Sequence, residues 1–377
     1  MVHATGRRLT ARAGTAVVAS LAVASLVMAG VAVTAAGAAQ AAVPDRWGFA
    51  FVGKPMVAGI PDLSHQAGSW PAPLHAHSAP GAPGQVFVRF PRLAAAGGIV
   101  HVTAVNAGAV WCQAQKWGPS GPGELVAVRC FAAGGVPVFS PFTVLFTTST
   151  PGPGPVPAGR AYSYLRWKPG SGIVTSFNSS GGATTVTPGT AGTWTVRMAG
   201  LGSAAALGGV QVNAVNPHKP AKCAVASWTS KPSAQVFIVR CYDAGSIPMR
   251  TGWTLSYQRK RAITGAQPRR FAYTFDNRPL HAGPYAPAPA GINFSSLGGV
   301  NTVRSAGTGL RLVRFPRVGK LPDTVLVTQF TGGPGFCNLA SLWATPSPDV
   351  VVRDVACYSP AGAPKNRASL VTYTSAH

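Results

Sequence analysis

One pattern of cysteines, tryptophans and aromatic strands occurs three times along the chain, in the same order each time. In each copy a strand-like segment with a Val-Arg pair precedes a cysteine that is followed by a tryptophan, and a second cysteine then stands directly before an aromatic residue. The Val-Arg pairs end at Arg89, Arg197 and Arg314, and the tryptophans are Trp117, Trp228 and Trp343. A repeated pattern of this kind is the signature of a repeat architecture, so the chain must fold as three related units.

An aromatic triplet opens each copy, at Phe49-Ala50-Phe51, Tyr162-Ser163-Tyr164 and Phe271-Ala272-Tyr273. Between the landmarks, short runs of Val, Thr, Phe and Tyr are bounded by Gly, Pro and Ser. The chain has 45 glycines and 34 prolines, which argue against long helices. The pattern predicts an all-β protein of three tandem, disulfide-stapled antiparallel β-sandwich domains.

The six cysteines allow fifteen pairings, and sequence alone normally does not choose among them. Here the repeat chooses one pair in each copy, which gives Cys112–Cys130, Cys223–Cys241 and Cys337–Cys357. Neighbouring antiparallel strands bring such residues within disulfide distance. Each bridge should stabilise its domain by about 3 kcal/mol in the chain-entropy model. No C-x-x-C or Cys/His cluster with ligand spacing occurs, so we expect no metal site.

The first 41 residues have the features of an export signal. Arg7, Arg8 and Arg12 form a basic start, an Ala/Val/Leu stretch follows over 15–36, and Ala39-Gln40-Ala41 is a small-residue cleavage motif. We therefore expect a signal peptide at 1–41 and a secreted, extracellular protein, with association to the cell wall as a further option. An uncleaved membrane anchor is the alternative, because the apolar stretch is long enough to span a bilayer.

Changes in composition mark the boundaries between the copies. Residues 150–159 form a Pro-rich linker that should stay extended, and residues 259–268 form a basic linker that should be solvated. We therefore predict β-sandwich repeats at 46–149, 160–258 and 269–377, each long enough to fold as a domain of its own.

Acidic residues are scarce. Loss of the three signal arginines from the 32 Lys and Arg leaves 29, against 8 Asp and Glu, which is a formal charge of about +21. Such a charge favours polyanionic partners, namely a wall polymer, nucleic acid or anionic lipid headgroups. A charge that merely keeps the protein soluble is the competing explanation.

Catalytic and cofactor signatures are missing from the sequence. The acidic residues are single and scattered, whereas general acid–base and glycosidase chemistry needs paired carboxylates. His65, His75 and His77 fall in a Pro/Ala-rich segment that we interpret as an exposed loop, although two imidazoles spaced as in His75-Ala76-His77 can bind a metal. We therefore expect no enzymatic activity and no cofactor.

Repeated arginines and tryptophans are the candidate ligand-binding residues. In an alternating strand an arginine points away from its buried neighbours, so Arg89, Arg129, Arg197, Arg240 and Arg314 are candidates for a basic stripe across the three domains. Protection of exposed strand edges is the alternative role. Trp117, Trp228 and Trp343 are candidates either for stacking platforms or for core residues that pack on the disulfides.

The landmarks as a set, among them Val196-Arg197 and Val239-Arg240-Cys241-Tyr242, resemble those of secreted repeat proteins of high-GC Gram-positive bacteria. This resemblance covers nearly the whole mature chain and implies secretion and β-domains, without an activity. The strand pattern also resembles jelly-roll modules, an analogy of fold that carries no function. We expect a secreted, non-catalytic binding or adhesion protein that engages an anionic extracellular polymer or surface. The alternatives are a structural component of the cell envelope or matrix, and a secreted hydrolase.

Overall fold

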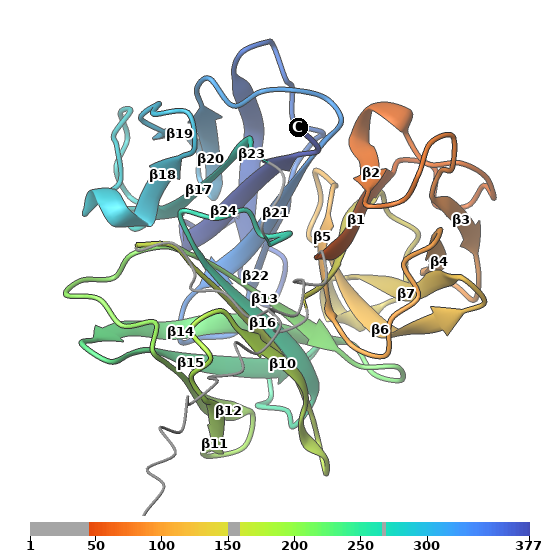
Figure 1. The fold of residues 1–377 in the computed structure, drawn as a ribbon, viewed down its shortest axis with the longest axis horizontal. Helices are drawn as coiled ribbons and strands as arrows, with labels where there is room; N and C mark the ends of the chain where they lie inside the picture. Colours follow the sequence, from red (N-terminus) through yellow and green to blue (C-terminus); the bar gives the residue numbers. More distant parts are fainter. Residues whose placement is uncertain (1–44, 150–158, 266–268) are drawn as a thin grey trace, which may run out of the picture. The chain divides into compact units, whose positions relative to one another are not determined.

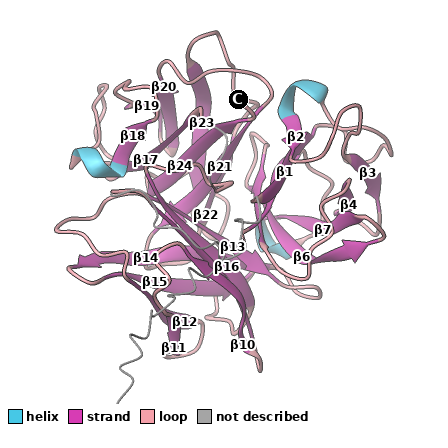
Figure 2. Ribbon diagram, viewed as in Figure 1, coloured by secondary structure: helices cyan, strands magenta, loops and turns pink. Residues whose placement is uncertain are grey.

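Strands form nearly all the regular structure of the protein (Figure 2). The computed structural model describes residues 45–149, 159–265 and 269–377. The predicted signal peptide, its cleavage site and most of the Pro-rich linker lie outside these ranges. Within them there are 24 strands and three short 3-10 turns, which confirms the all-β prediction. In these ranges, no helix has the length and apolar character needed to cross a membrane.

Each repeat contributes eight strands. The first has β1 (Arg46–Val52), β2 (Gln66–Gly68), β3 (His77–Pro80), β4 (Gln85–Phe90), β5 (Ile99–Ala104), β6 (Val110–Ser120), β7 (Gly123–Ala132) and β8 (Phe142–Thr148). The second has β9 (Ala161–Lys168), β10 (Gly172–Asn178), β11 (Thr184–Pro188), β12 (Thr193–Ala199), β13 (Gly209–Val215), β14 (Ala221–Lys231), β15 (Ala234–Asp243) and β16 (Gly252–Arg259). The third has β17 (Phe271–Asp276), β18 (Asn293–Ser295), β19 (Thr302–Gly307), β20 (Leu310–Phe315), β21 (Asp323–Phe330), β22 (Phe336–Leu339), β23 (Val350–Tyr358) and β24 (Ala368–Ser375).

The eight strands of each repeat form two four-stranded antiparallel sheets with one common topology. The first sheets have the orders β2-β1-β8-β5, β10-β9-β16-β13 and β18-β17-β24-β21. The second sheets have the orders β3-β4-β7-β6, β11-β12-β15-β14 and β19-β20-β23-β22. Apolar side chains from both sheets of a repeat meet in one core. Each repeat is therefore an antiparallel β-sandwich, as the sequence predicts.

One disulfide staples a hairpin in each second sheet. Cys112–Cys130 joins β6 to β7, Cys223–Cys241 joins β14 to β15, and Cys337–Cys357 joins β22 to β23. The two cysteines of each pair lie directly opposite one another, with Cα atoms 4.0–4.1 Å apart. The three predicted pairings are confirmed. Three disulfides indicate an oxidising environment for the folded chain.

A parallel bridge joins each repeat to the next, at equivalent residues each time. Val215 pairs with Ala114, Phe330 with Val225, and Val105 with Leu339. The first sheet of repeat 2 thus continues into the second sheet of repeat 1, that of repeat 3 into repeat 2, and that of repeat 1 into repeat 3. The three sandwiches therefore close a ring, which can be followed by colour from red through green to blue in Figure 1.

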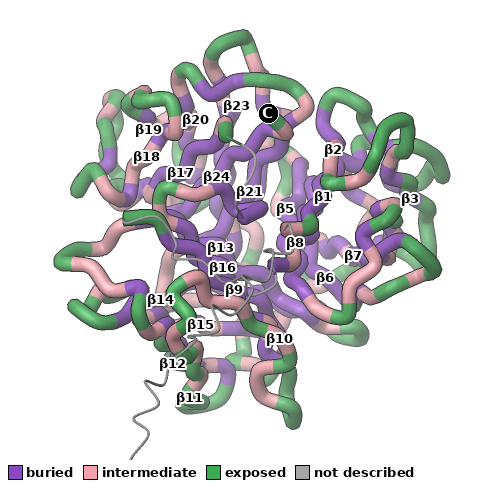
Figure 3. Tube along the Cα trace, in the orientation of Figure 1, coloured by how far each residue is buried: buried purple, intermediate pink, exposed green. Residues whose placement is uncertain are grey.

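Strands β5, β13 and β21 contact one another inside this ring and are buried along almost their whole length (Figure 3). Equivalent polar residues on them hydrogen-bond to the main chain of a neighbouring central strand. Thr103 Oγ1 accepts from the Val327 N–H at 3.0 Å, Asn213 Nδ2 donates to the Val102 carbonyl at 3.0 Å, and Thr328 Oγ1 donates to the Val212 carbonyl at 3.1 Å. Buried polar groups need such partners, so these contacts help to fix how the repeats pack.

Strand register corrects one landmark of the sequence alignment. Phe49, Tyr164 and Tyr273 are the equivalent residues, because they face the equivalent positions Leu145, Ser256 and Thr372 of the neighbouring strands. The opening triplet of the first copy is therefore Trp47-Gly48-Phe49, two residues before the predicted one. Strand β1 carries aromatic rings at three alternate positions, and sequence alone does not choose among them.

The predicted solvated linker at 259–268 is wrong over part of its length. Arg259 still belongs to β16, and Ala262, Ile263 and Thr264 are buried. Ile263 packs with Trp47, and its carbonyl accepts a hydrogen bond from the Tyr162 hydroxyl at 2.6 Å. This segment is buried because it packs against the other repeats, which its basic composition does not reveal. The domain boundaries themselves stay a prediction.

Candidate anion-binding cleft

The residue two positions after the corrected aromatic triplet lies at a contact between repeats in every copy. Phe51 lies edge-on to Trp343 of the third repeat, with ring centroids 6.2 Å apart. Phe275 packs against the core of the second repeat. At the equivalent position the second repeat has Arg166, whose guanidinium lies 4.0 Å from the ring centroid of Trp117 in the first repeat. An arginine thus replaces a phenylalanine at one of three related contacts.

The contact made by Arg166 leaves a cleft of about 310 Å³ between the first two repeats. One wall is the segment 95–97 together with residues 117–119 of β6, and the other wall is Arg166 with Val174 and Thr175 of β10. Gly97 lies against Thr175, because a Cβ atom added at Gly97 would be 3.1 Å from the threonine Oγ1. The cleft is therefore narrow at this point, and it has polar as well as apolar groups on its walls.

The guanidinium of Arg166 has no acceptor for its N–H groups within the part of the chain that the structure describes. Burial lowers the pKa of this guanidinium, but an arginine remains charged at all ordinary pH values. The guanidinium carbon lies over the ring of Trp117. The five N–H bonds of a guanidinium lie in its own plane, so they stay available to a ligand. Partial burial strengthens their attraction for an anion, because water competes less there.

A buried carboxyl group supports the loop that forms one wall. Glu124 is fully buried, its Oε2 accepts from the Ala95 N–H at 3.1 Å, and its Oε1 has no partner. The Trp117 Nε1 is also buried without a partner, whereas the equivalent Trp228 donates to Gln235 at 2.8 Å. Burial raises the pKa of Glu124 to about 7, against the smaller opposing effect of the Ala95 N–H. Near neutral pH this wall therefore holds a carboxyl group that titrates.

Unlike the contact made by Arg166, the contact between repeats 3 and 1 is held together by hydrogen bonds to a buried carboxylate. Asp323 is fully buried and accepts hydrogen bonds from Trp343 Nε1 at 2.8 Å and Thr345 Oγ1 at 2.6 Å, while His65 Nδ1 lies 2.8 Å from the same carboxylate. Phe51 lies edge-on to both His65 and Trp343. The expectation of an exposed loop is wrong for His65, which the turn at Leu63–His65 carries into this contact.

The predicted stripe arginines lie on β4, β12, β20, β7 and β15. Arg89, Arg197 and Arg314 are exposed, and Arg129 and Arg240 are partly buried. Arg89 donates to the Ser120 carbonyl and Arg197 to Ser233 Oγ, whereas Arg314 forms an ion pair with Asp349. Arg129 donates to the Pro83 carbonyl, and Arg240 reaches the Gly332 carbonyl of the third repeat at 2.8 Å. A ligand-binding role for these arginines stays a prediction.

The three predicted tryptophans differ in exposure. Trp117 and Trp343 are buried in the cores of repeats 1 and 3, and Trp228 is half-buried against the core of repeat 2. Trp343 is bound to Asp323, and Trp228 to Gln235. Only Trp117 among them lines the Arg166 cleft. Its indole is 9% exposed and covered by the guanidinium, so it positions Arg166 rather than offering an open ring face.

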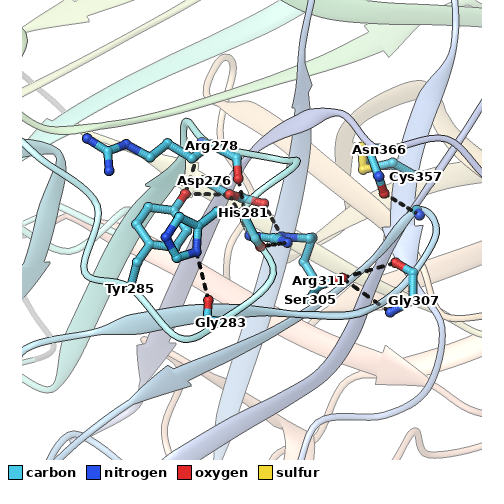
Figure 4. Close-up of polar contacts among 12 residues, drawn as sticks. Asp276, Arg278, His281, Gly283, Tyr285, Ser305, Gly307, Arg311, Cys357 and Asn366 are labelled. Carbon is cyan, nitrogen blue, oxygen red and sulfur yellow. Dashed lines mark hydrogen bonds and ion pairs between the residues drawn. A yellow bond between two sulfur atoms is a disulfide. The ribbon is translucent and has the colours of Figure 1, made fainter.

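A second buried charge, Arg311, holds the loop after β17 (Figure 4). Its Nε donates to Asp276 Oδ2 at 2.8 Å, and its other N–H groups reach the carbonyls of His281 and Arg278. The Tyr285 hydroxyl donates to Asp276 Oδ1 at 2.6 Å. Four of the five N–H groups of Arg311 therefore have acceptors within the protein, and this ion pair orders the loop.

Sequence reasoning missed Arg166, Glu124 and Arg311. Each stands where another copy has a residue of different chemistry: Arg166 for phenylalanine, Glu124 for Gln235, and Arg311 for Trp194. A comparison of the copies position by position would have found all three, but it requires the strand register.

No group of three or more His, Cys, Asp or Glu residues suited to a metal ion occurs among the described residues. Comparison with known proteins finds no match among family models, curated proteins or solved structures. The function must therefore be argued from the cleft itself.

Proposed function

We propose that the protein is an extracellular, non-catalytic binding protein that engages an anionic polymer through the cleft at Arg166. The observation that carries this proposal is a partly buried guanidinium that is stacked on Trp117 and has no acceptor in the described structure. A carboxylate or phosphate group supplies the missing acceptors. Charge-assisted hydrogen bonds of this kind contribute about 1.5–3 kcal/mol each.

The size of the cleft supports one charged unit of a polymer as the ligand. Its volume of about 310 Å³ is at the lower end of the roughly 300–1,000 Å³ that small-molecule sites have. A single sugar acid or phosphodiester unit is of suitable size, and the rest of a polymer would then run over the surface of the protein.

The charge distribution favours a polyanion over a small free anion. The chain has 32 Lys and Arg against 8 Asp and Glu, and such an excess draws polyanions to the surface. Arg89 and Arg197 have no carboxylate partner among the described residues, whereas Arg314 is paired with Asp349. We therefore expect the first two repeats to contribute more to binding than the third.

The experiment measures binding of poly(glycerol phosphate) and of polygalacturonate by titration calorimetry over a range of NaCl concentrations. The wild type should bind at least one of them with an affinity that falls steeply as salt rises. Arg166→Gln should weaken binding by about tenfold or more, which corresponds to one lost charge-assisted contact.

Arg304→Gln is the matched control, because Arg304 is an exposed arginine on β19, far along the chain from the cleft. It should change the affinity by less than about twofold, as expected for one screened surface charge. Binding of neither polymer at low salt would overturn the proposal, and so would equal losses in the two variants.

A further inference from the structure

The second repeat has an unusually short connection between its first two strands. Residues 169–171 join β9 to β10, whereas residues 53–65 join β1 to β2 and residues 277–292 join β17 to β18. Each long connection crosses to the outermost strand of the second sheet and pairs with it, through Gly59 in repeat 1 and Tyr285 in repeat 3. Packed sheets lie about 10 Å apart, so residues 169–171 are too few to cross and return. One end of the second sandwich therefore lacks the cover that the other two have.

In the third repeat the long connection binds to three residues at this end of the sandwich (Figure 4). The Tyr285 hydroxyl donates to Asp276 Oδ1 at 2.6 Å, and the N–H groups of Arg311 donate to two main-chain carbonyls of the connection. The Ser305 N–H donates to a third carbonyl at 3.1 Å, and the Tyr285 ring packs against the core. By strand register, the residues of the second repeat that correspond to Asp276, Arg311 and Ser305 are Trp167, Trp194 and Pro188.

A pocket of about 100 Å³ lies at this end of the second repeat, and Trp167, Trp194 and Pro188 all line it. Their counterparts in the third repeat bind the long connection, so the pocket is the space that the connection fills there. The two tryptophans are 8% and 2% exposed, with ring centroids 4.8 Å apart, so a ligand meets only a small part of each. One water molecule requires about 10–15 Å³ when volume is measured in this way. The pocket therefore has room for one six-membered ring, such as the ring of Tyr285 in the third repeat.

Arg250 also lines this pocket, and it is exposed. Its guanidinium has no hydrogen bond or ion pair within the described residues. The equivalent residues of the other repeats contact the framework, because Phe139 packs against the core of repeat 1 and Asn366 Oδ1 accepts from the Gly309 N–H at 2.7 Å. Gly309 corresponds to Gly192 in the pocket wall, since each carbonyl accepts from the second cysteine of its repeat. A side chain at this position can therefore reach the pocket, and repeat 2 has an unpaired cation there.

We propose that this pocket binds a single six-membered ring that carries a carboxylate. The ring would pack against the two tryptophans, and the carboxylate would accept charge-assisted hydrogen bonds from Arg250. The described residues that line the pocket include no acidic residue, and the chain as a whole is strongly basic, so an anion is favoured over a cation. No residue lines both this pocket and the Arg166 cleft, so the site does not rest on the function proposed above.

Aromatic acids and sugar acids share this chemistry, and crystals of the full protein soaked with benzoate or with galacturonate distinguish them. The proposal predicts electron density for the ring of at least one of the two acids in the pocket, with its carboxylate within hydrogen-bond distance of Arg250. Water alone in the pocket after both soaks would overturn it. This measurement uses the wild-type chain and so does not depend on whether a variant folds.

A second experiment compares the affinity of the acid that binds with the affinity of its uncharged amide by titration calorimetry. The wild type should bind the acid about fivefold or more tightly, because only the acid forms charge-assisted hydrogen bonds with the arginine. Arg250→Gln should lose this preference, while Arg304→Gln, which removes an exposed arginine on β19, should keep it. The same preference in Arg250→Gln would contradict the proposal, whatever is found at the Arg166 cleft.

Discussion

Two contacts between repeats involve equivalent positions but differ in residue type and in hydrogen bonding. Where repeat 1 meets repeat 3, Phe51 packs on Trp343, and the indole N–H is bound by the buried Asp323. Where repeat 2 meets repeat 1, Arg166 stands in the place of the phenylalanine, and the N–H of Trp117 has no partner. At the first contact the side chains of Trp343, Thr345 and His65 are all bound to Asp323. The second leaves a guanidinium without an acceptor beside a cleft, and a few such polar groups are what orient a ligand in a site.

The free energy of unfolding should distinguish the two tryptophans. Trp343→Phe should lower the free energy of unfolding by about 2 kcal/mol more than Trp117→Phe, because it leaves the buried Asp323 short of a donor. Both changes remove a similar volume, so the loss of packing is matched. Urea denaturation of the two variants measures the difference. Equal losses would mean that the hydrogen bond from Trp343 to Asp323 adds no stability beyond packing.

The carboxyl group at the wall of the cleft should make stability depend on pH. The pKa of Glu124 is about 7 in the folded protein, against an ordinary value of 4.5, so the folded state binds more protons between these values. Stability from this group is therefore highest at low pH and falls as pH rises from about 4.5 to 7, by about 2–3 kcal/mol in total.

Glu124→Gln removes that loss, so its stability relative to wild type should be greater at pH 8 than at pH 4. Repeat 2 has a glutamine, Gln235, at the equivalent position, so we expect the variant to fold. Denaturation at both pH values checks the sign. Gln235→Glu is the reciprocal variant and should acquire the same pH dependence. A pH profile unchanged in Glu124→Gln would exclude this residue as its source.

The smallest effect on stability is expected at the cleft itself. Arg166→Phe places at the second contact the residue type that the other two contacts have, so the free energy of unfolding should change by about 1 kcal/mol or less. Chemical denaturation measures it. A loss of several kcal/mol would show that the arginine is needed to hold the repeats together.

Local patterns in the sequence predicted the framework of the molecule. The cysteine pairs, the β-rich segments and the three copies can be read directly, because a disulfide and its flanking strands form one short hairpin. The ring is not visible in this way. It depends on single bridges such as Val215 to Ala114, and on Thr103, Asn213 and Thr328, two threonines and an asparagine at one shared position.

The candidate site was harder to predict for a related reason. Arg89 and Arg197 can be recognised in the sequence because they interrupt apolar strands, and both are exposed in the structure. Arg166 follows a buried aromatic segment, and nothing local shows that its guanidinium lies on a tryptophan of another repeat. A one-position difference between copies becomes visible only after the register of β1, β9 and β17 is known.

The most direct test is to compare wild type and Arg166→Phe for binding to whichever of the two polymers the wild type binds, at one low salt concentration. The account predicts a loss of about tenfold or more in affinity, with a free energy of unfolding within about 1 kcal/mol of wild type. Equal affinity in a folded Arg166→Phe variant would contradict the claim that the open contact is the binding site.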